Sequence, residues 1–444
     1  MSAVFFHWDL YQHSLYVAPN SRVARFYVIE TAPRQTIAMT LPIASVPNGT
    51  VSSAKGFSAG GVFAGIKTPG ADKLDIGLLV SDQPCTVAGT FSQNSILSPT
   101  VTLSSDRVGV DKRVRAVVAN SGCANTAVGA QGMVDAKEMT DIAATQLGVT
   151  AEETLVCSTG VIGVEIPMAL MREFIPQIEV AADGGGDFAK AILTTDKRTK
   201  EIAVSFDVDG VTHTVGGVSK GSGMIHPNMA TMLAFTTTDA NVDPAFLQAT
   251  LSQAVKLSFN QIDVDGDQST NDTVLLMANG AAGGPVISGG DDASETFAEA
   301  VRQVCEHLAI EIARDGEGAT KLIEVTVEGA HSDDDALLGA RECAASLLVK
   351  TAVYGRDPNW GRIFMAVGKA QIPLDESKID CYVNDIQIVF EGRAIAYNVQ
   401  SVVSALGGDE VRLRVDLNVG DGYGRAWGCD LTEEYVVFNS AYTT

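Results

Sequence analysis

The chain has 444 residues, of which 46% are hydrophobic, and its 54 acidic and 31 basic side chains give a net charge of −23. A chain of this length can form two or three domains of ordinary size. The acidic balance argues against a nucleic-acid partner, because binding to phosphates depends on lysine and arginine. No uninterrupted apolar run is long enough to span a membrane.

Cysteine and histidine spacing gives no support for a metal site. The seven cysteines form no CxxC pair, and the six histidines show no HxH or HxxxH pattern. We therefore expect free thiols in a reducing compartment.

The first 38 residues differ from the rest of the chain. They begin with aromatic residues and continue with three arginines, without the order of segments that marks a secretory signal. Asp9, Glu30 and the aromatic residues argue against a transit peptide. We expect residues 1–38 to be a non-core extension, with Met39 as a candidate for the true start. The protein is expected to be cytoplasmic, and organellar only if residues 1–38 prove to be a transit peptide.

Strand and helix patterns alternate through both halves of the chain, which favours layered α/β packing. Short runs that favour strands, bounded by glycine or turn residues, occur at 62–66, 76–80, 113–119, 154–160, 201–208, 211–215, 232–238 and 321–328. Apolar residues at helical spacing predict helices at 135–147, 167–174, 243–255, 294–314 and 336–351. Asp209-Gly210 predicts a hairpin turn, and the last hundred residues are expected to be rich in strands.

The central stretch of the sequence is Lys220-Gly-Ser-Gly-Met-Ile-His-Pro-Asn-Met-Ala-Thr231. Its glycines and Pro227 predict a constrained loop that leads into a strand. Thr231 is a candidate nucleophile, but a threonine hydroxyl needs a base. The threonine's own α-amine would be that base if the chain cut itself between Ala230 and Thr231. On the residues alone, a glycine-rich turn before a buried strand is the favoured alternative. A Walker loop is excluded because Lys220 precedes the glycines.

Two further stretches concentrate charged residues. The stretch 263–272 contains four aspartates, but Gln268 and Val274 occupy positions where a calcium loop needs glycine and glutamate. A magnesium site stays open there, and a solvated or hydrogen-bonded turn is favoured. The stretch 354–362 contains two arginines that could bind carboxylates or form a structural turn. Glu317 lies between two glycines and is expected to be exposed.

Six stretches together resemble the glutamate N-acetyltransferase/ornithine acetyltransferase family of arginine biosynthesis. They are Ser158–Gly163, Thr194–Asp196, Lys220–Leu233, Arg314–Lys321, Tyr354–Arg362 and Asn439–Thr444. The resemblance covers the chain from about residue 45 to its end, and its long central motif is highly specific. It implies a two-lobed α/β layered sandwich of the N-terminal-nucleophile type. It also implies self-processing into an α chain (39–230) and a β chain (231–444), assembled as an α2β2 heterotetramer.

The resemblance also implies the chemistry and the site. Thr231 would accept the acetyl group of N-acetylornithine and pass it to glutamate in a ping-pong reaction. The Thr159 hydroxyl and the Gly160 N–H would form the oxyanion hole. The implied substrate-binding residues are Thr194 or its neighbour Thr195, Lys220, Thr231, Glu317, Asn439 and Thr444. No metal or cofactor is implied, although some family members accept acetyl-CoA as a first donor.

Three other functions remain open from the sequence. The first is an N-terminal-nucleophile aminopeptidase or amidohydrolase, which would share the cleavage but use water as the acceptor. The second is a magnesium-dependent phosphotransferase that uses the aspartates of 263–272. The third is a binding protein that never cleaves itself.

Overall fold

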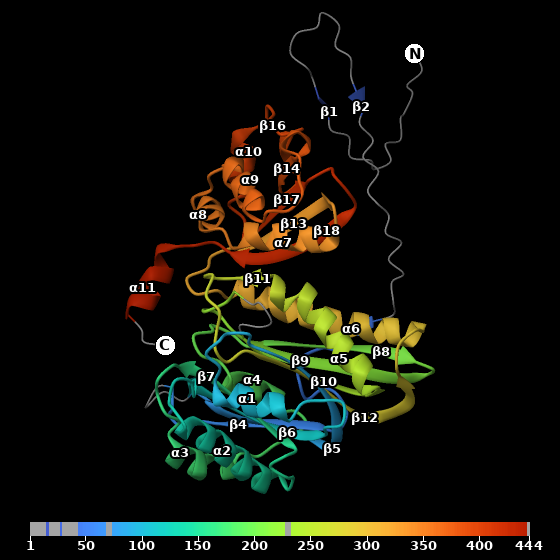
Figure 1. Ribbon diagram of the computed structural model, residues 1–444, viewed down its shortest axis with the longest axis vertical. Helices are drawn as coiled ribbons and strands as arrows, with labels where there is room; N and C mark the ends of the chain where they lie inside the picture. The colour runs from blue at the N-terminus through green and yellow to red at the C-terminus, as the bar shows by residue number, and fades with distance from the viewer. Residues whose placement is uncertain (1–14, 17–26, 29–42, 68–72, 227–231, 442–444) are drawn as a thin grey trace, which may run out of the picture. The chain divides into compact units, whose positions relative to one another are not determined.

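The computed structural model describes residues 15–16, 27–28, 43–67, 73–226 and 232–441 (Figure 1). The chain divides into residues 1–41 and residues 42–444. In the first unit, β1 (Leu15–Tyr16) pairs antiparallel with β2 (Tyr27–Val28). The boundaries at 38/39 and at Ala230/Thr231 lie outside the described residues, so the three predicted segments stay predictions.

The second unit contains a nine-stranded sheet in the order β3-β8-β9-β10-β12-β5-β6-β7, with β4 paired to β5. Its strands are β3 (Ile43–Ser45), β4 (Phe57–Val62), β5 (Ile76–Phe91), β6 (Val114–Cys123), β7 (Thr154–Val161), β8 (Lys200–Val208), β9 (Val211–Lys220), β10 (Leu233–Val242) and β12 (Thr273–Ile287). The long strand β5 pairs with β4 and β6 through its first half and with β12 through its last six residues. It therefore joins two halves of the sheet.

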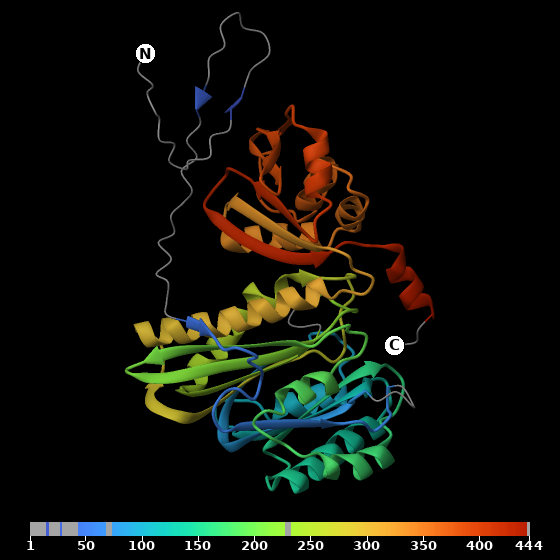
Figure 2. The ribbon, with the colours of Figure 1, turned by 180° about the vertical axis from the view of Figure 1, so that it is seen from behind.

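The two halves face each other with the short helix α4 (Gly185–Ala191) packed between them, and further helices cover their outer faces (Figures 1 and 2). Between them lies a buried core in which Phe188 and Phe235 meet edge to face, with their ring centroids 5.1 Å apart. The helices of this lobe are α1 (Pro99–Asp106), α2 (Gln131–Leu147), α3 (Met168–Phe174), η1 (Ile175–Gln177), α4 (Gly185–Ala191), α5 (Pro244–Leu257), η2 (Phe259–Gln261) and α6 (Asp292–Arg314). Helices α5 and α6 cover the half with β8 to β12, and α2 and α3 cover the half with β4 to β7. The result is a four-layered helix–sheet–sheet–helix sandwich.

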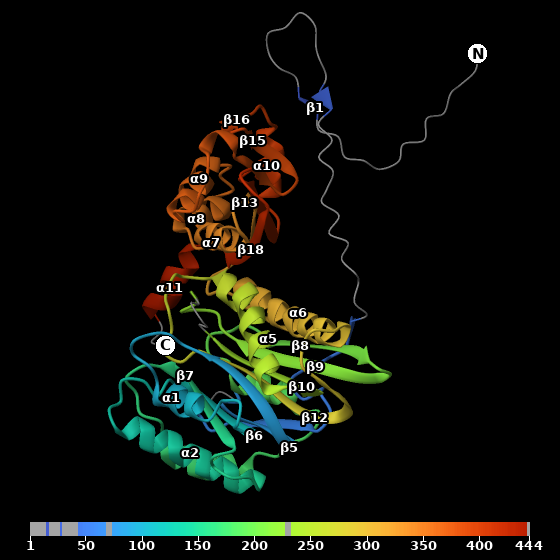
Figure 3. The same ribbon diagram turned by 45° about the vertical axis from the view of Figure 1, so that its right-hand side comes forward.

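The second lobe is built on a seven-stranded sheet in the order β11-β18-β13-β17-β14-β15-β16 (Figure 3). Its elements are β11 (Ile262–Asp263), β13 (Leu322–Ala330), α7 (Asp333–Ala344), α8 (Leu347–Gly355), α9 (Trp360–Lys369), η3 (Glu376–Lys378), β14 (Asp380–Val383), β15 (Ile386–Phe390), β16 (Arg393–Ala394), α10 (Val399–Ala405), β17 (Glu410–Asp416), β18 (Gly422–Cys429) and α11 (Glu433–Ala441). A separate core of aliphatic side chains lies between this sheet and its helices. The two-lobed, layered α/β prediction is confirmed.

Local sequence signals explain several element boundaries. Asp243 caps α5, because its Oδ1 accepts the N–H groups of Ala245 and Phe246 at 3.0 Å, and Pro244 begins the helix. Asp209 and Gly210 both have positive φ at the turn of the β8–β9 hairpin, as predicted. All seven cysteines are buried free thiols, in agreement with the prediction. Among the described helices none is long and apolar enough to cross a membrane.

Two sequence-based predictions of the second lobe are wrong. The expected helix 336–351 is two helices, because Ser346 caps a new one by accepting the N–H of Val349. The end of the chain was expected to continue as strand, but 433–441 is α11. Glu433 and Glu434 in its first turn complement the helix dipole, and the apolar run that follows has no strand partner among the described residues.

The central motif connects two neighbouring strands of the first lobe. β9 and β10 pair antiparallel from Val215↔Thr238 to Lys220↔Leu233. The paired ends, Lys220 and Leu233, lie close to the end of β7 and to the second lobe's α11. Residues 227–231, including Ala230 and Thr231, lie outside the described residues.

Candidate active site

A cavity of about 140 Å³ gathers residues from both lobes at the end of β9. Its lining includes all of the predicted site residues that the structure describes, namely Thr159, Gly160, Thr194, Thr195, Lys220, Glu317 and Asn439. Thr231 and Thr444 lie outside the described residues, and so does the cleavage site. Segments that are up to 280 residues apart in sequence, Thr159 and Asn439, therefore share one cavity.

The end of β7 carries the two predicted oxyanion donors. Lys220 Nζ donates to Thr159 Oγ1 at 3.1 Å, in a buried position. Because an ammonium group cannot accept a hydrogen bond, the Thr159 hydroxyl must accept here, and its own hydrogen is free for another acceptor. Gly160 has a φ of 131°, and a Cβ at this position would lie 2.3 Å from the carbonyl carbon of Gly122. Only glycine fits beside the neighbouring strand.

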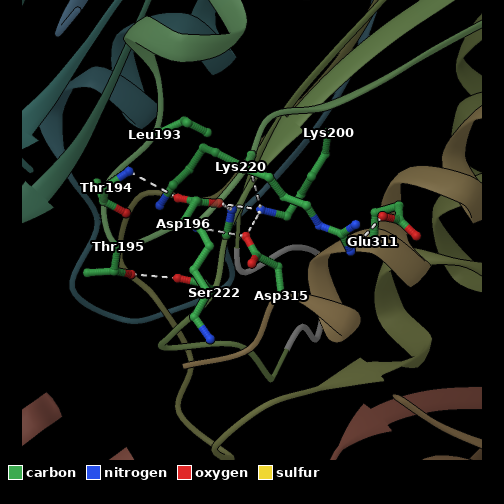
Figure 4. A network of polar contacts seen from close by, with 12 residues as sticks. Leu193, Thr194, Thr195, Asp196, Lys200, Lys220, Ser222, Glu311 and Asp315 are labelled. Carbon is green, nitrogen blue, oxygen red and sulfur yellow. Dashed lines mark hydrogen bonds and ion pairs between the residues drawn. The ribbon is translucent and has the colours of Figure 1, made fainter. Parts of the chain in front are cut away.

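Behind Lys220 lies a buried ionic network (Figure 4). Lys200 Nζ contacts Asp196 Oδ1 at 2.6 Å and Asp315 Oδ2 at 2.7 Å, and all three side chains are almost completely buried. Asp196 also accepts the backbone N–H of Gly221 at 2.7 Å and that of Thr194 at 3.0 Å. One carboxylate thus joins the backbone at Thr194 to the backbone directly after Lys220. Asp196 and Asp315 both lie in motifs that the sequence singled out. Their connection through Lys200 was not predicted.

The charges around Lys220 control its protonation. Burial lowers the pKa of Lys220, whereas Asp196 opposes this shift most strongly, with smaller help from Asp272 and Glu317. Lys200 lowers the pKa of Lys220 further. Burial would raise the pKa of Asp196, but Lys200 and Lys220 outweigh burial and hold that pKa well below its usual range. Asp196 is therefore an anion that favours the ammonium form of Lys220.

The two adjacent threonines differ in their hydrogen bonds. Thr195 Oγ1 lies 2.6 Å from Ser222 Oγ, so its hydroxyl is already paired. The hydroxyl of Thr194 has no hydrogen-bond partner among the residues that the structure describes, although it lines the cavity. This difference favours Thr194 as the substrate contact.

Glu317 lines the cavity and is buried, so the expectation that it is exposed was wrong. Its backbone N–H donates to Ser222 O at 2.8 Å, and its carboxylate accepts from Asn439 Nδ2 at 2.9 Å. The turn thus folds against the central motif and α11. A Cβ on Gly223 would lie 2.4 Å from the Glu317 carboxylate, which explains the glycine at this position.

Residues of the aspartate-rich stretch also line the cavity, which the sequence did not indicate. Asp265 Oδ2 accepts the N–H of Met224 at 2.7 Å, and Asp265 Oδ1 accepts that of Ile225 at 2.9 Å. Asp263 contacts His226 Nδ1 at 2.8 Å and Lys350 Nζ at 2.9 Å. These contacts fit a hydrogen-bonded turn that shapes the loop after Lys220. Within the described parts of the chain, no group of three or more His, Cys, Asp or Glu side chains is arranged to hold a metal ion.

The stretch 354–362 does not line this cavity. Arg356 has a left-handed conformation at the end of α8, and Arg362 Nη1 donates to Leu348 O at 2.9 Å. Arg362 also lies 3.9 Å from Asp357. The contacts fit the structural turn between α8 and α9 rather than a carboxylate-binding loop.

In a plot of kcat/KM against pH, the basic limb is expected to follow deprotonation of Lys220. Replacing Asp196 by asparagine is expected to move this limb to lower pH by about one pH unit. Asparagine keeps an oxygen that can accept the Gly221 N–H but removes the charge that raises the pKa of Lys220. Because lysine is charged only below its pKa, a lower pKa ends the active range at lower pH. Asp315→Asn is the matched control, since Asp315 also binds Lys200, whereas Asp196 is the anion that raises the pKa of Lys220 most. An equal shift in both variants would contradict the conclusion that Asp196 favours the ammonium form of Lys220.

Comparison with known proteins gives one family. The ArgJ family model matches residues 58–444. The arginine biosynthesis bifunctional protein ArgJ of Dehalococcoides mccartyi is 45% identical over 399 residues, covering 90% of this chain and 98% of that protein. The protein of the same name from Geobacillus kaustophilus is 44% identical over 416 residues, covering 93% and 100%. A crystal structure of ArgJ from Bacillus halodurans is 44% identical, with a TM-score of 0.47, and covers 48% of this chain and 100% of the solved chain.

Proposed function

Because this chain belongs to the ArgJ family, we propose that it transfers the acetyl group of N2-acetylornithine to glutamate in arginine biosynthesis. The observation that carries the proposal is the cavity at the end of β9. It combines Thr159 and Gly160, a buried cation and several carboxylates within one small volume. Amino-acid substrates carry both a carboxylate and an amine, so a cavity with both signs of charge suits them.

The reaction has two half-reactions. The Thr231 hydroxyl attacks the acetyl carbonyl and gives its proton to the α-amine of Thr231. The negative charge on the former carbonyl oxygen is stabilised by the Thr159 hydroxyl and the Gly160 N–H. The C–N bond then breaks, and ornithine leaves with the proton. In the second half-reaction the α-amine of glutamate attacks the acetyl ester and gives a proton to the α-amine of Thr231. The ester C–O bond then breaks, the proton passes to the Thr231 oxygen, and N-acetylglutamate leaves.

Substrate binding is assigned to the remaining lining residues. Lys220 attracts the substrate carboxylate, and Thr194 offers a hydroxyl beside it. Glu317 and Asn439, joined by a hydrogen bond, bind the other end of the amino acid together with Thr444. Thr194, Lys220, Glu317 and Asn439 line the cavity, which supports these roles, and the role of Thr444 rests on the family resemblance alone.

The α-amine of Thr231 requires a cut after Ala230. We expect an α chain of residues 39–230 and a β chain of residues 231–444 that assemble as a cytoplasmic α2β2 heterotetramer. The reaction needs no cofactor or metal in this scheme, and acetyl-CoA is a possible second donor of the acetyl group.

Two measurements test the proposal. Mass spectrometry under denaturing conditions should give two fragments that meet between Ala230 and Thr231. Incubation with N-acetylornithine should then give ornithine and N-acetylglutamate in equal amounts over many turnovers only when glutamate is present. Release of acetate without glutamate would identify a hydrolase and overturn the transferase. A third arm with acetyl-CoA and glutamate, scored by free CoA, decides whether acetyl-CoA serves as a donor.

A further inference from the structure

The amide of Asn271 connects three segments beneath the oxyanion donors. Asn271 is buried in the loop before β12. Its Nδ2 donates to the carbonyl oxygens of Ala124, just beyond β6, and Ser158, within β7, the latter at 2.9 Å. Its Oδ1 accepts the hydroxyls of Thr126 at 2.8 Å and Thr270 at 2.6 Å. Both amide hydrogens and both lone pairs of the oxygen are therefore used.

These partners fix the orientation of the amide. Two carbonyl oxygens can be paired only by the NH2 side, because a carbonyl has no hydrogen to donate. The two hydroxyls then face the amide oxygen. A side chain of the same shape that carries two oxygens cannot make this set of bonds.

The Ser158 carbonyl belongs to the peptide bond that precedes Thr159. The bond from Asn271 therefore fixes the orientation of the strand directly before the two oxyanion donors. A second contact supports the same segment, since Ser158 Oγ donates to Asn120 Oδ1 at 2.7 Å and Asn120 Nδ2 donates to Cys123 O at 3.0 Å. The latter two residues belong to β6, so the ends of β6 and β7 are held together and against the loop that carries Asn271.

We propose that Asn271 is a positioning residue of the acetyl transfer, which holds the end of β7 so that Thr159 and Gly160 face the reacting carbonyl. The inference rests on the proposed function. Asn271 also follows the proposed cleavage site, whereas Ala124 and Ser158 precede it. In the processed enzyme, one chain then carries the oxyanion donors and the other chain holds them in place.

Asn271→Asp is the sharpest variant because it keeps the shape of the side chain. Its second carboxylate oxygen would face two carbonyl oxygens, so the end of β7 must move. Displacing oxyanion donors acts on the transition state, and we expect kcat to fall about 100-fold while KM for N-acetylornithine stays within about threefold.

Asn279→Asp is the matched control. Asn279 is buried like Asn271, and its Nδ2 donates to Lys55 O at 3.0 Å and to Ser81 Oγ at 3.1 Å. The substitution removes the same kind of bonds, and none of these three residues lines the cavity. We expect a comparable loss of thermal stability with unchanged kcat. Equal losses of kcat in both variants, or an unchanged kcat in folded Asn271→Asp, would overturn the inference.

A double-mutant cycle separates positioning from general stability. If Asn271 acts through Thr159, the loss of kcat in Thr159→Val/Asn271→Asp is smaller than the product of the two single losses. A multiplicative loss would contradict the inference. If Asn271→Asp does not fold, Thr126→Val replaces it, with an expected fall in kcat of about fivefold at unchanged KM. An unchanged kcat in that variant counts against the inference. Absence of transfer by the wild-type enzyme would instead refute the proposed function.

Discussion

Replacing Thr231 by alanine is expected to leave the chain uncut and to reduce acetyl transfer by about 10⁴-fold or more. The hydroxyl is required twice, first for the cleavage that exposes the α-amine and then for formation of the acetyl ester. Denaturing mass spectrometry reports the first step, and glutamate-dependent release of ornithine reports the second.

Thr231→Ser is the control for this variant. Serine keeps a hydroxyl and can expose an α-amine, so the chain should still be cut and transfer should persist at a reduced rate. Full transfer by an uncut Thr231→Ala chain would refute both the nucleophile and its base.

Lys200→Met is expected to lower the free energy of unfolding by about 3–5 kcal/mol, because it leaves two carboxylates buried without their cation. Asp196 and Asp315 both bind Lys200 Nζ, and the network lies within the first lobe beside the cavity. Urea denaturation measures the effect. Lys190→Met is the control, since Lys190 forms an exposed ion pair with Asp187 and such a pair contributes about 1 kcal/mol or less.

The loss in Lys200→Met should depend on pH in a defined direction. Without the Lys200 cation, burial raises the pKa of Asp196 in the folded state above that in the unfolded chain. The folded variant then binds more protons than the unfolded chain, so its stability rises as the pH falls. The difference from the wild type should narrow between pH 7 and pH 5. A gap that stays constant over this range, or a loss below 1 kcal/mol at pH 7, would show that the network is not electrostatic in origin.

Sequence patterns predicted elements with local signals well. Asp243-Pro244 and Asp209-Gly210 have backbone preferences that do not depend on distant residues, and both begin or join elements as predicted. The prediction of a strand at 433–441 was wrong because the apolar residues of this segment fit either a strand or a helix. The choice between the two depends on partners elsewhere in the fold.

Only the site residues that lie in contiguous sequence motifs could be predicted. Resemblance singled out Thr159, Gly160, Lys220, Glu317 and Asn439, which the fold brings to one cavity. Lys200 and Asn271 have no local signal, since a lysine in a strand and an asparagine in a polar loop are usually solvated. Their importance comes from burial among partners that lie up to about 150 residues away in sequence.

The pairing of β9 with β10 has a consequence for how the processed enzyme would persist. A cut between Ala230 and Thr231 falls in the connection between two strands that are neighbours in the middle of a sheet. The two pieces therefore stay paired through the hydrogen bonds between β9 and β10, and they can separate only if the sheet opens. Once opened, the pieces must find each other again, so recovery from denaturation would depend on protein concentration, unlike that of the uncut precursor. The lifetime of the cut enzyme is then set by the rate at which the sheet opens, because chains that separate at low concentration do not readily form the enzyme again.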